Sequence, residues 1–194
     1  MKTQFTLLAL FITFSIYSQN QKATLFLKDS TTKEGYAKIT SYQKIVFRKT
    51  KKDEKITYDY TSVKKLLIDS DGKDIEYVYK VIRDGPFKVM LIEPIIKGEI
   101  NLFRTITSGT SSISMGNGMN FTNSGSKTTY FMSINSNDVA INLKIGNTYS
   151  KRFKKIAKKY FSDCPDLLSK IENKYFSRYD IRNVVEYYNN KCIE

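Results

Sequence analysis

Residues 139–161, VAINLKIGNTYSKRFKKIAKKYF, contain the point at which the chain changes from strand to helix. Before Gly146, apolar residues recur with the period of two that is typical of a strand with one buried face: Val139, Ile141, Leu143 and Ile145. From Tyr149 to Phe161 they recur at i, i+4, i+7 and i+8, as on one face of an α-helix. The stretch therefore predicts an α+β fold, with a β domain over residues 22–146 and a helical cap over 147–194.

The period of two also runs through most of the preceding chain. Further strand candidates, separated by turn signals, are 23–27, 35–40, 44–48, 55–60, 64–68, 75–81, 88–92, 100–106 and 129–134. Lys51–Glu54 suits a charged hairpin tip, Asp71-Gly72 a tight turn, and Pro94 a strand end, an edge or a bulge. About 8–10 strands joined by short turns favour an antiparallel meander that closes into a barrel or folds into a sandwich.

Residues 107–127 differ from the rest of the β domain. Ser, Thr, Asn and Gly dominate this stretch, and Lys127 is its only charge. Such a composition buries little surface, which predicts either a flexible loop or a long hairpin tip, with the flexible polar loop favoured. The apolar residues within it leave a contact role open: Ile113, Met115, Met119 and Phe121.

The C-terminal region predicts three short helices that pack on the sheet. Pro165 suits the first turn of the second helix, with Asp163 or Cys164 at its N-cap. Ser177 and Asp180 have the spacing of a capping box for the third helix. Its expected inner face consists of Ile181, Val184, Val185 and Tyr188.

The first 18 residues predict a secretory signal peptide. Lys2 precedes an uncharged, mostly apolar stretch from Phe5 to Tyr17, which is shorter than the ~20 residues of a membrane-spanning helix. The alternative is an uncleaved N-terminal anchor. No later stretch is apolar for long enough to span a membrane, so the mature chain is expected to lack a transmembrane helix.

Export changes the interpretation of the two cysteines. In an oxidising compartment Cys164 and Cys192 form the one possible intramolecular pair, and we expect a structural disulfide that joins the start of the second helix to the end of the third. The alternative is a reactive thiol. The sequence has no His to activate a thiolate and no CxxC motif, so the disulfide is favoured.

Positive charge is the other marked feature. The chain has 32 Lys and Arg against 19 Asp and Glu, a formal charge of +13. Opposite the apolar stripe of the first C-terminal helix lie six basic residues that we take as a candidate site for an anionic surface: Lys151, Arg152, Lys154, Lys155, Lys158 and Lys159. Export argues against nucleic acid. The candidate partners are lipid head groups in a peripheral membrane contact, lipopolysaccharide phosphates or an acidic protein, and the alternative is a merely solvated face.

Catalytic and metal-binding patterns are weak throughout. The absence of His excludes Ser-His-Asp and Cys-His catalysis and HExxH zinc sites. Residues 69–74 resemble a calcium loop, but Lys80 stands where an EF-hand needs Glu, which favours a hairpin turn. Glu93 and Glu99 are the least ordinary acids, and an edge strand or a Lys97 partner explains them better than a glycosidase pair.

Three functions of different classes are considered, and the third is an unrecognised hydrolase that two facing carboxylates in a cleft would support. The first is a non-enzymatic envelope protein that acts by binding or scaffolding and needs no cofactor or metal. The alternative is a carrier whose barrel interior takes a small apolar ligand against Tyr58, Tyr77 and Tyr79.

Several segments resemble a family of uncharacterised exported Bacteroidetes proteins. The matching residues are IKGEINLFR at 96–104, TYF at 129–131, FKK at 153–155, YFSDCP at 160–165 and the VEYYN-containing segment 181–192; the SQNQ at 18–21 has the same style. The resemblance implies a β-rich body with a Cys-containing helical C-terminus and no established activity. It also implies the periplasm or outer envelope of a Gram-negative cell.

Overall fold

The structure is a computed structural model. It describes residues 20–193 except 42, 84–85, 87, 116–118, 135–136, 144–147, 149 and 177–178, and of 108–124 it describes only the backbone. The expected signal peptide, residues 1–18, therefore lies outside the described residues. Within the described part, no helix combines the length and the apolar character needed to cross a membrane.

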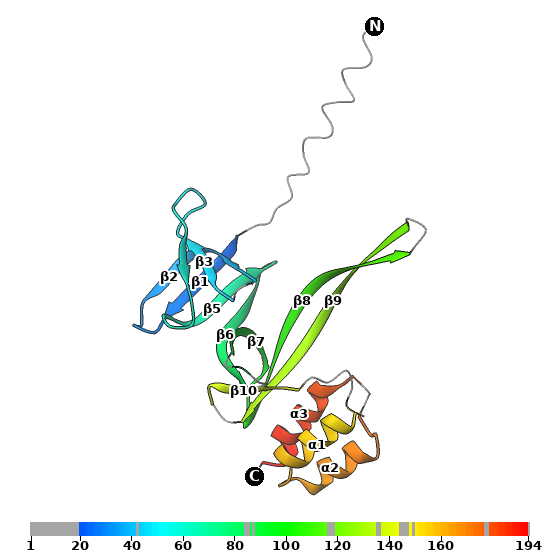
Figure 1. The fold of residues 1–194 in the computed structure, drawn as a ribbon. Coiled ribbons are helices and arrows are strands. Elements are labelled where there is room, and N and C mark those ends of the chain that lie inside the picture. Colours follow the sequence, from blue (N-terminus) through cyan, green and yellow to red (C-terminus); the bar gives the residue numbers. More distant parts are fainter. Residues whose placement is uncertain are drawn as a thin grey trace.

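Ten strands and three helices confirm the α+β prediction (Figure 1). The strands lie in one sheet in the order β10-β9-β8-β7-β6-β5-β1-β2-β3-β4, almost entirely as an antiparallel meander. Their bounds are β1 Gln21–Leu27, β2 Thr32–Ile39, β3 Ile45–Arg48, β4 Ile56–Tyr58, β5 Val63–Ser70, β6 Lys73–Arg83, β7 Lys88–Ile96, β8 Ile100–Met115, β9 Met119–Ile134 and β10 Val139–Asn142.

The long strand β6 divides this sheet into two curved parts (Figure 1). Its first half, 73–77, pairs with β5, and its second half, 78–82, pairs with β7. We call β1–β5 with the first half of β6 the upper sheet. Its core consists of strand residues from the inward faces, with Leu25, Ile45 and Leu66 fully buried.

The second half of β6 belongs to a closed ring of strands. β10 pairs antiparallel with β9 and parallel with β6, so the order β6-β7-β8-β9-β10 returns to β6. We call these five strands the lower ring. Each contributes one buried residue to a common interior: Ile82, Ile92, Phe103, Phe131 and Ala140. The interior of the ring is thus filled by the chain's own side chains.

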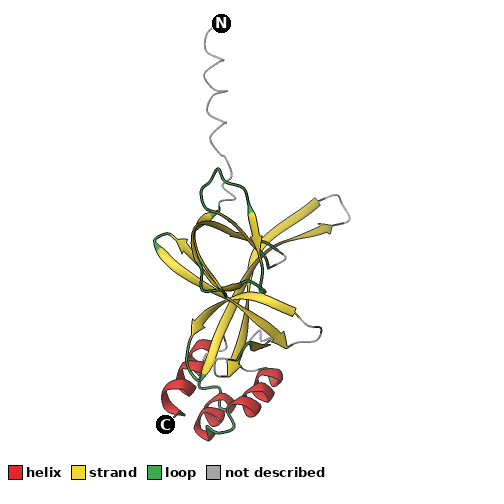
Figure 2. Ribbon diagram, turned by 90° about the vertical axis from the view of Figure 1, so that its left-hand side faces the viewer, coloured by secondary structure: helices red, strands yellow, loops and turns green. Residues whose placement is uncertain are grey.

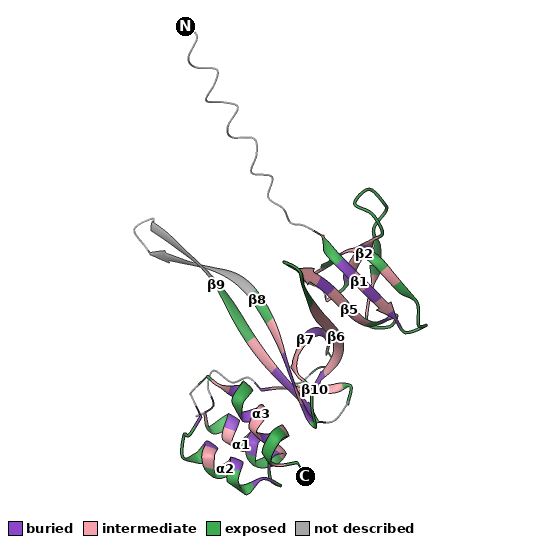
Figure 3. Cartoon of the chain, turned by 180° about the vertical axis from the view of Figure 1, so that it is seen from behind, coloured by how far each residue is buried: buried purple, intermediate pink, exposed green. Residues whose placement is uncertain are grey.

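The polar segment 107–127 is not the flexible loop that its composition favours. β8 and β9 continue through it as one hairpin whose register runs from Ile100 opposite Ile134 to Met115 opposite Met119, which is the long-hairpin alternative. Described residues on both of its strands are exposed, Ile106 to 54%, and Figure 3 shows the exposed colour appearing as the two strands leave the ring. Residues 106–107 and 125–128 are all exposed, and a strand that is exposed on both faces has no reason to alternate polar and apolar residues.

The turn predictions hold where the structure describes them. Asp71 and Gly72, both with positive φ, form the tight turn between β5 and β6. The charged stretch 51–54 joins β3 to β4. Pro94 adjoins a shift in the register between β7 and β8, which is a bulge or irregularity of the kind that tolerates proline.

The three helices gather at one end of the strands (Figure 2). They are α1 Lys151–Tyr160, α2 Pro165–Glu172 and α3 Ile181–Lys191. Their buried faces form one core with Ile100, Leu102, Met132 and Leu143 from the ring side. We call α1–α3 the helical cap.

The structure confirms one of the two predicted helix N-caps and corrects the other. Cys164 occupies the N-cap of α2, with Pro165 next, although it makes no side-chain capping bond. For α3 the predicted Ser177–Asp180 box is wrong, because Asp180 itself is the N-cap and its Oδ1 accepts from the backbone N–H of Asn183 at 3.1 Å. Ser177 lies outside the described residues.

A side-chain amide joins the cap to the ring in a way that the sequence did not reveal. Asn189 of α3 donates its Nδ2 to the carbonyl of Ile100 at 2.9 Å, and its Oδ1 accepts from the Ile100 N–H at 3.0 Å. A Cβ at Gly98 would lie 2.5 Å from Asn189 Nδ2, so glycine is required for this close approach.

Candidate functional site

The basic helix α1 is anchored to the cap by its apolar side. Ser150 accepts from the N–H of Phe153 at 3.1 Å and begins the helix. Phe153 and Ala157 are fully or almost fully buried in the core that α1 shares with the ring and the other helices. Because the apolar stripe is already used inside the protein, only the basic side of α1 is available to a partner.

The six predicted basic residues form one continuous face. With 3.6 residues per turn they spread over about 160° of the helix surface. Their order across that face is Lys154, Lys158, Lys151, Lys155, Lys159 and Arg152. All except Lys154, which is half-buried, are exposed.

One edge of this face is tied to the neighbouring helix. Lys158 lies 3.0 Å from Glu172 at the end of α2, and Lys154 donates to the Glu172 carbonyl at 3.4 Å. The hydrogen bond and charge of Lys158 lower the pKa of the Glu172 carboxyl. Both side chains of this pair are more than half exposed, so the pair is a weak one.

The rest of the face has no acidic partner among the described residues. Lys151, Arg152 and Lys155 are exposed and make no ion pair within the described part of the chain. Lys159 lies 5.2 Å from the ring centroid of its neighbour Tyr160 and likewise pairs with no described carboxylate. We call Lys151, Arg152, Lys155 and Lys159 the open basic face.

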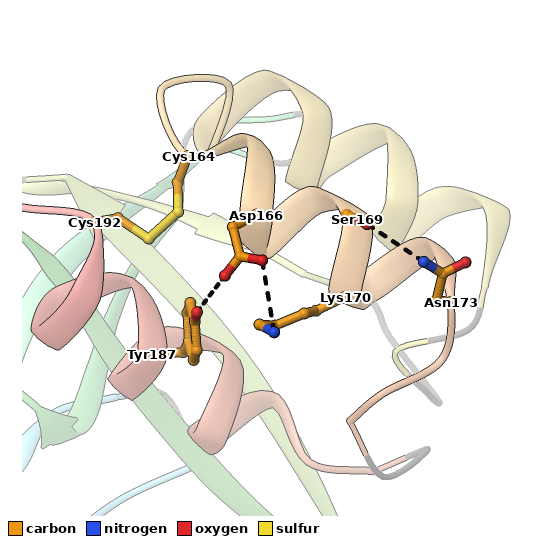
Figure 4. Close-up of polar contacts among 7 residues, drawn as sticks. All are labelled: Cys164, Asp166, Ser169, Lys170, Asn173, Tyr187 and Cys192. Atoms are coloured by element: carbon orange, nitrogen blue, oxygen red, sulfur yellow. Dashed lines mark hydrogen bonds and ion pairs between the residues drawn. A yellow bond between two sulfur atoms is a disulfide. The ribbon is translucent and has the colours of Figure 1, made fainter.

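The predicted disulfide is present and braces the cap behind this face (Figure 4). Cys164 and Cys192 are bonded, with Cα atoms 5.5 Å apart, and connect the start of α2 to the end of α3. Beside it, Asp166 accepts a hydrogen bond from the hydroxyl of Tyr187 and pairs with Lys170 at 3.5 Å. The Tyr187 hydroxyl, followed by Lys170, lowers the pKa of Asp166.

The two acids singled out in the sequence, Glu93 and Glu99, have different surroundings. Glu93 receives two hydrogen bonds of 2.8 Å from Arg104 on the neighbouring strand, whereas Lys97 pairs with Glu76 and not with Glu93. Glu99 is exposed. Glu93 thus has a structural partner of opposite charge, and the Lys97 partner expected for it is wrong.

The remaining candidates also have structural roles. Asp69 accepts from the N–H of Gly72 at 2.8 Å and closes the β5–β6 turn, as the hairpin interpretation predicts. Tyr58, Tyr77 and Tyr79, the expected lining of a carrier, pack against the core of the upper sheet. Within the described part, no three Cys, Asp or Glu residues gather closely enough to hold a metal ion.

Comparison with known protein families, with curated proteins and with solved structures finds no match to this chain. Its function is therefore argued from its own residues.

Proposed function

We propose that this chain is an exported, non-enzymatic protein of the periplasm or outer envelope, and that its open basic face binds a phosphate-bearing lipid surface. The observation that carries the proposal is the set of four exposed cations on α1 without an acidic partner in the described structure. The apolar start of the chain and its likeness to exported Bacteroidetes proteins support the location.

Contact with the surface is electrostatic and peripheral. An interfacial helix that inserts into lipid needs a free apolar face, but Phe153 and Ala157 hold that face of α1 in the core. Each Lys or Arg near an anionic membrane contributes about 1 kcal/mol, and salt screens this attraction over about 10 Å at 0.1 M. Binding should therefore weaken strongly as the salt concentration rises.

Vesicle sedimentation tests the proposal. The mature chain is mixed with vesicles of phosphatidylcholine alone, or with one third phosphatidylglycerol, at low and high salt. We expect binding only to the anionic vesicles at low salt, and at least a tenfold loss when all four residues of the open basic face are changed to Gln.

A matched variant controls for net charge. It changes four exposed lysines of the upper sheet to Gln and removes the same charge: Lys22, Lys52, Lys55 and Lys73. We expect it to bind anionic vesicles nearly as well as the unmodified chain. Equal, negligible binding to both kinds of vesicle, or an equal loss in the two variants, would overturn the proposal.

The filled lower ring disfavours a carrier that uses the ring interior, whereas the tyrosines expected to line a carrier, Tyr58, Tyr77 and Tyr79, pack against the core of the upper sheet. Phe103 and Phe131 are almost fully buried in the ring interior together with Ile92 and Ala140. These side chains belong to the protein's own core.

A further inference from the structure

A hollow of about 260 Å³ lies where the upper sheet meets the lower ring. Its apolar lining comes from three valines, Val63, Val81 and Val89, and from the rings of Tyr60 and Tyr79. It is smaller than the roughly 300–1,000 Å³ of pockets that hold drug-sized ligands, so it suits a small molecule.

The aromatic wall of this hollow is held in place before any ligand arrives. The hydroxyl of Tyr79 donates to the carbonyl of Gln43 at 2.6 Å, and the Gln43 side chain accepts from the N–H of Leu91 at 2.9 Å. Tyr60 packs edge-on against Tyr79, with ring centroids 6.4 Å apart. A ligand would therefore meet a preformed surface, which lowers the entropic cost of binding.

The charges around the hollow are unbalanced. Lys28, Lys64 and Lys80 line it against one carboxylate, that of Asp138. The nearby Asp59 does not line it, but the two hydrogen bonds from Thr61, followed by the charges of Lys44 and Lys28, lower the pKa of this carboxyl, so Lys28 has an acid close to it.

Lys80 is the least ordinary of these residues. Its side chain is only 12% exposed, whereas Asp138, 3.6 Å away, is 91% exposed and so compensates the charge weakly. Its ammonium donates to the Asn137 carbonyl at 2.9 Å and lies 5.7 Å from the centroid of the Phe103 ring. A largely buried cation whose described ion pair is to an exposed carboxylate, beside an apolar hollow, favours an anionic group on a small apolar body.

We propose that this hollow binds a small organic carboxylate, with its apolar body against the valines and tyrosines and its anionic group among Lys28, Lys64 and Lys80. The site is built from strands β5, β6 and β7 and from the turns that hold Lys28, Tyr60 and Asp138, apart from the open basic face on α1. It adds a ligand to the proposed surface contact and does not depend on it.

Titration with sodium octanoate, followed by calorimetry and by amide chemical shifts, tests this site. We expect saturable binding that shifts the amides of Val81 and Val89. Octan-1-ol, which has the same chain without the charge, should bind at least tenfold more weakly, because hydrogen bonds to charged groups are the stronger ones.

Two variants test whether the lysines bind the anionic group of the ligand. Lys80→Met keeps the aliphatic stem, and Lys64→Gln changes an exposed side chain of β5. Each should raise the Kd for octanoate about tenfold. The variant of the open basic face should leave that Kd unchanged, and Lys80→Met should still bind anionic vesicles, so the two proposals fail separately.

Three results would overturn the proposal. They are an absence of saturation by octanoate, equal affinity for octanoate and octanol, and shifts confined to residues outside the hollow. If Lys80→Met does not fold, an unchanged Kd for octanoate in Lys64→Gln would overturn the proposal.

Discussion

Removing the Cys164–Cys192 disulfide should destabilise the protein mainly through its unfolded state. The bond joins residues 28 positions apart, from the N-cap of α2 to the C-cap of α3. For a loop of this length, the loss of chain entropy in the unfolded state corresponds to about 3.6 kcal/mol at 25 °C. The variant Cys164→Ala/Cys192→Ala should lose about that much free energy of unfolding, since Ala leaves no free thiol.

Urea unfolding measures the loss, with circular dichroism at 222 nm reporting the helices and tyrosine fluorescence reporting the whole chain. The unmodified protein with a reductant should match the double variant, and a reductant should not affect the double variant. If the two signals separate, the cap unfolds before the sheet, and the loss belongs to the cap transition.

A loss below about 1 kcal/mol would refute this reasoning. It would mean that the unfolded cap region is already held compact without the bond. The paired side chains Tyr188 and Asp163, whose hydrogen bond is 2.6 Å long, would be the first to test for such residual structure.

Three further variants test particular contacts. Glu93→Gln should lower the free energy of unfolding, measured in urea, by about 1–3 kcal/mol, because it leaves Arg104 without its carboxylate. Adding Arg104→Met should recover part of this loss. A double variant that loses more than the sum of the two single variants would contradict the pairing. Asp180→Ala should lower the free energy of unfolding by about 1 kcal/mol in the same assay, because it removes the N-cap of α3. Asp180→Asn should lower it much less, because Asn is also a good N-cap residue. Burial, and then its hydrogen bond to Asp163, raise the pKa of Tyr188 to about 12, so the stability that this shift contributes is present below pH 10 and is lost between pH 10 and 12. Tyr188→Phe should lose less stability over that interval, and an identical decline would contradict the assignment.

Local periodicity was sufficient to predict the three helices and most of the strands, but not the outer parts of β8 and β9. Each strand or helix buries one face against the layer next to it. The alternation around Val139 and the i, i+4 spacing after Gly146 follow directly from which face is buried. The disulfide was predictable because two cysteines allow one pairing. The basic face of α1 was predictable because the spacing that predicts the helix also places its six basic residues opposite the apolar stripe.

The pairings that depart from the predicted meander, β1 with β5 and β10 with β6, were not predictable in this way. Periodicity does not identify the partner of a strand, so the parallel pairing of Val139 with Val81 that closes the ring left no local signal. The hairpin of β8 and β9 is exposed at 106–107 and 125–128, where its side chains are described, and because segment 107–127 lacks alternation its composition resembled a loop. The pairing of Lys158 with Glu172 likewise depends on how α1 and α2 lie in the cap.

The change of partners along β6 accounts for the position of the proposed carboxylate site. Residues 73–77 face β5 and residues 78–82 face β7, so the two curved parts of the sheet diverge near Tyr79 and leave space between them. Lys80 stands at this divergence, where a strand interior normally excludes charge. An apolar residue there would close the hollow and remove a buried charge, and it would be the simpler solution if stability alone were required. The Asn137 carbonyl and the Phe103 ring stabilise part of this buried charge, and the proposed carboxylate would compensate more of it than the exposed Asp138 does.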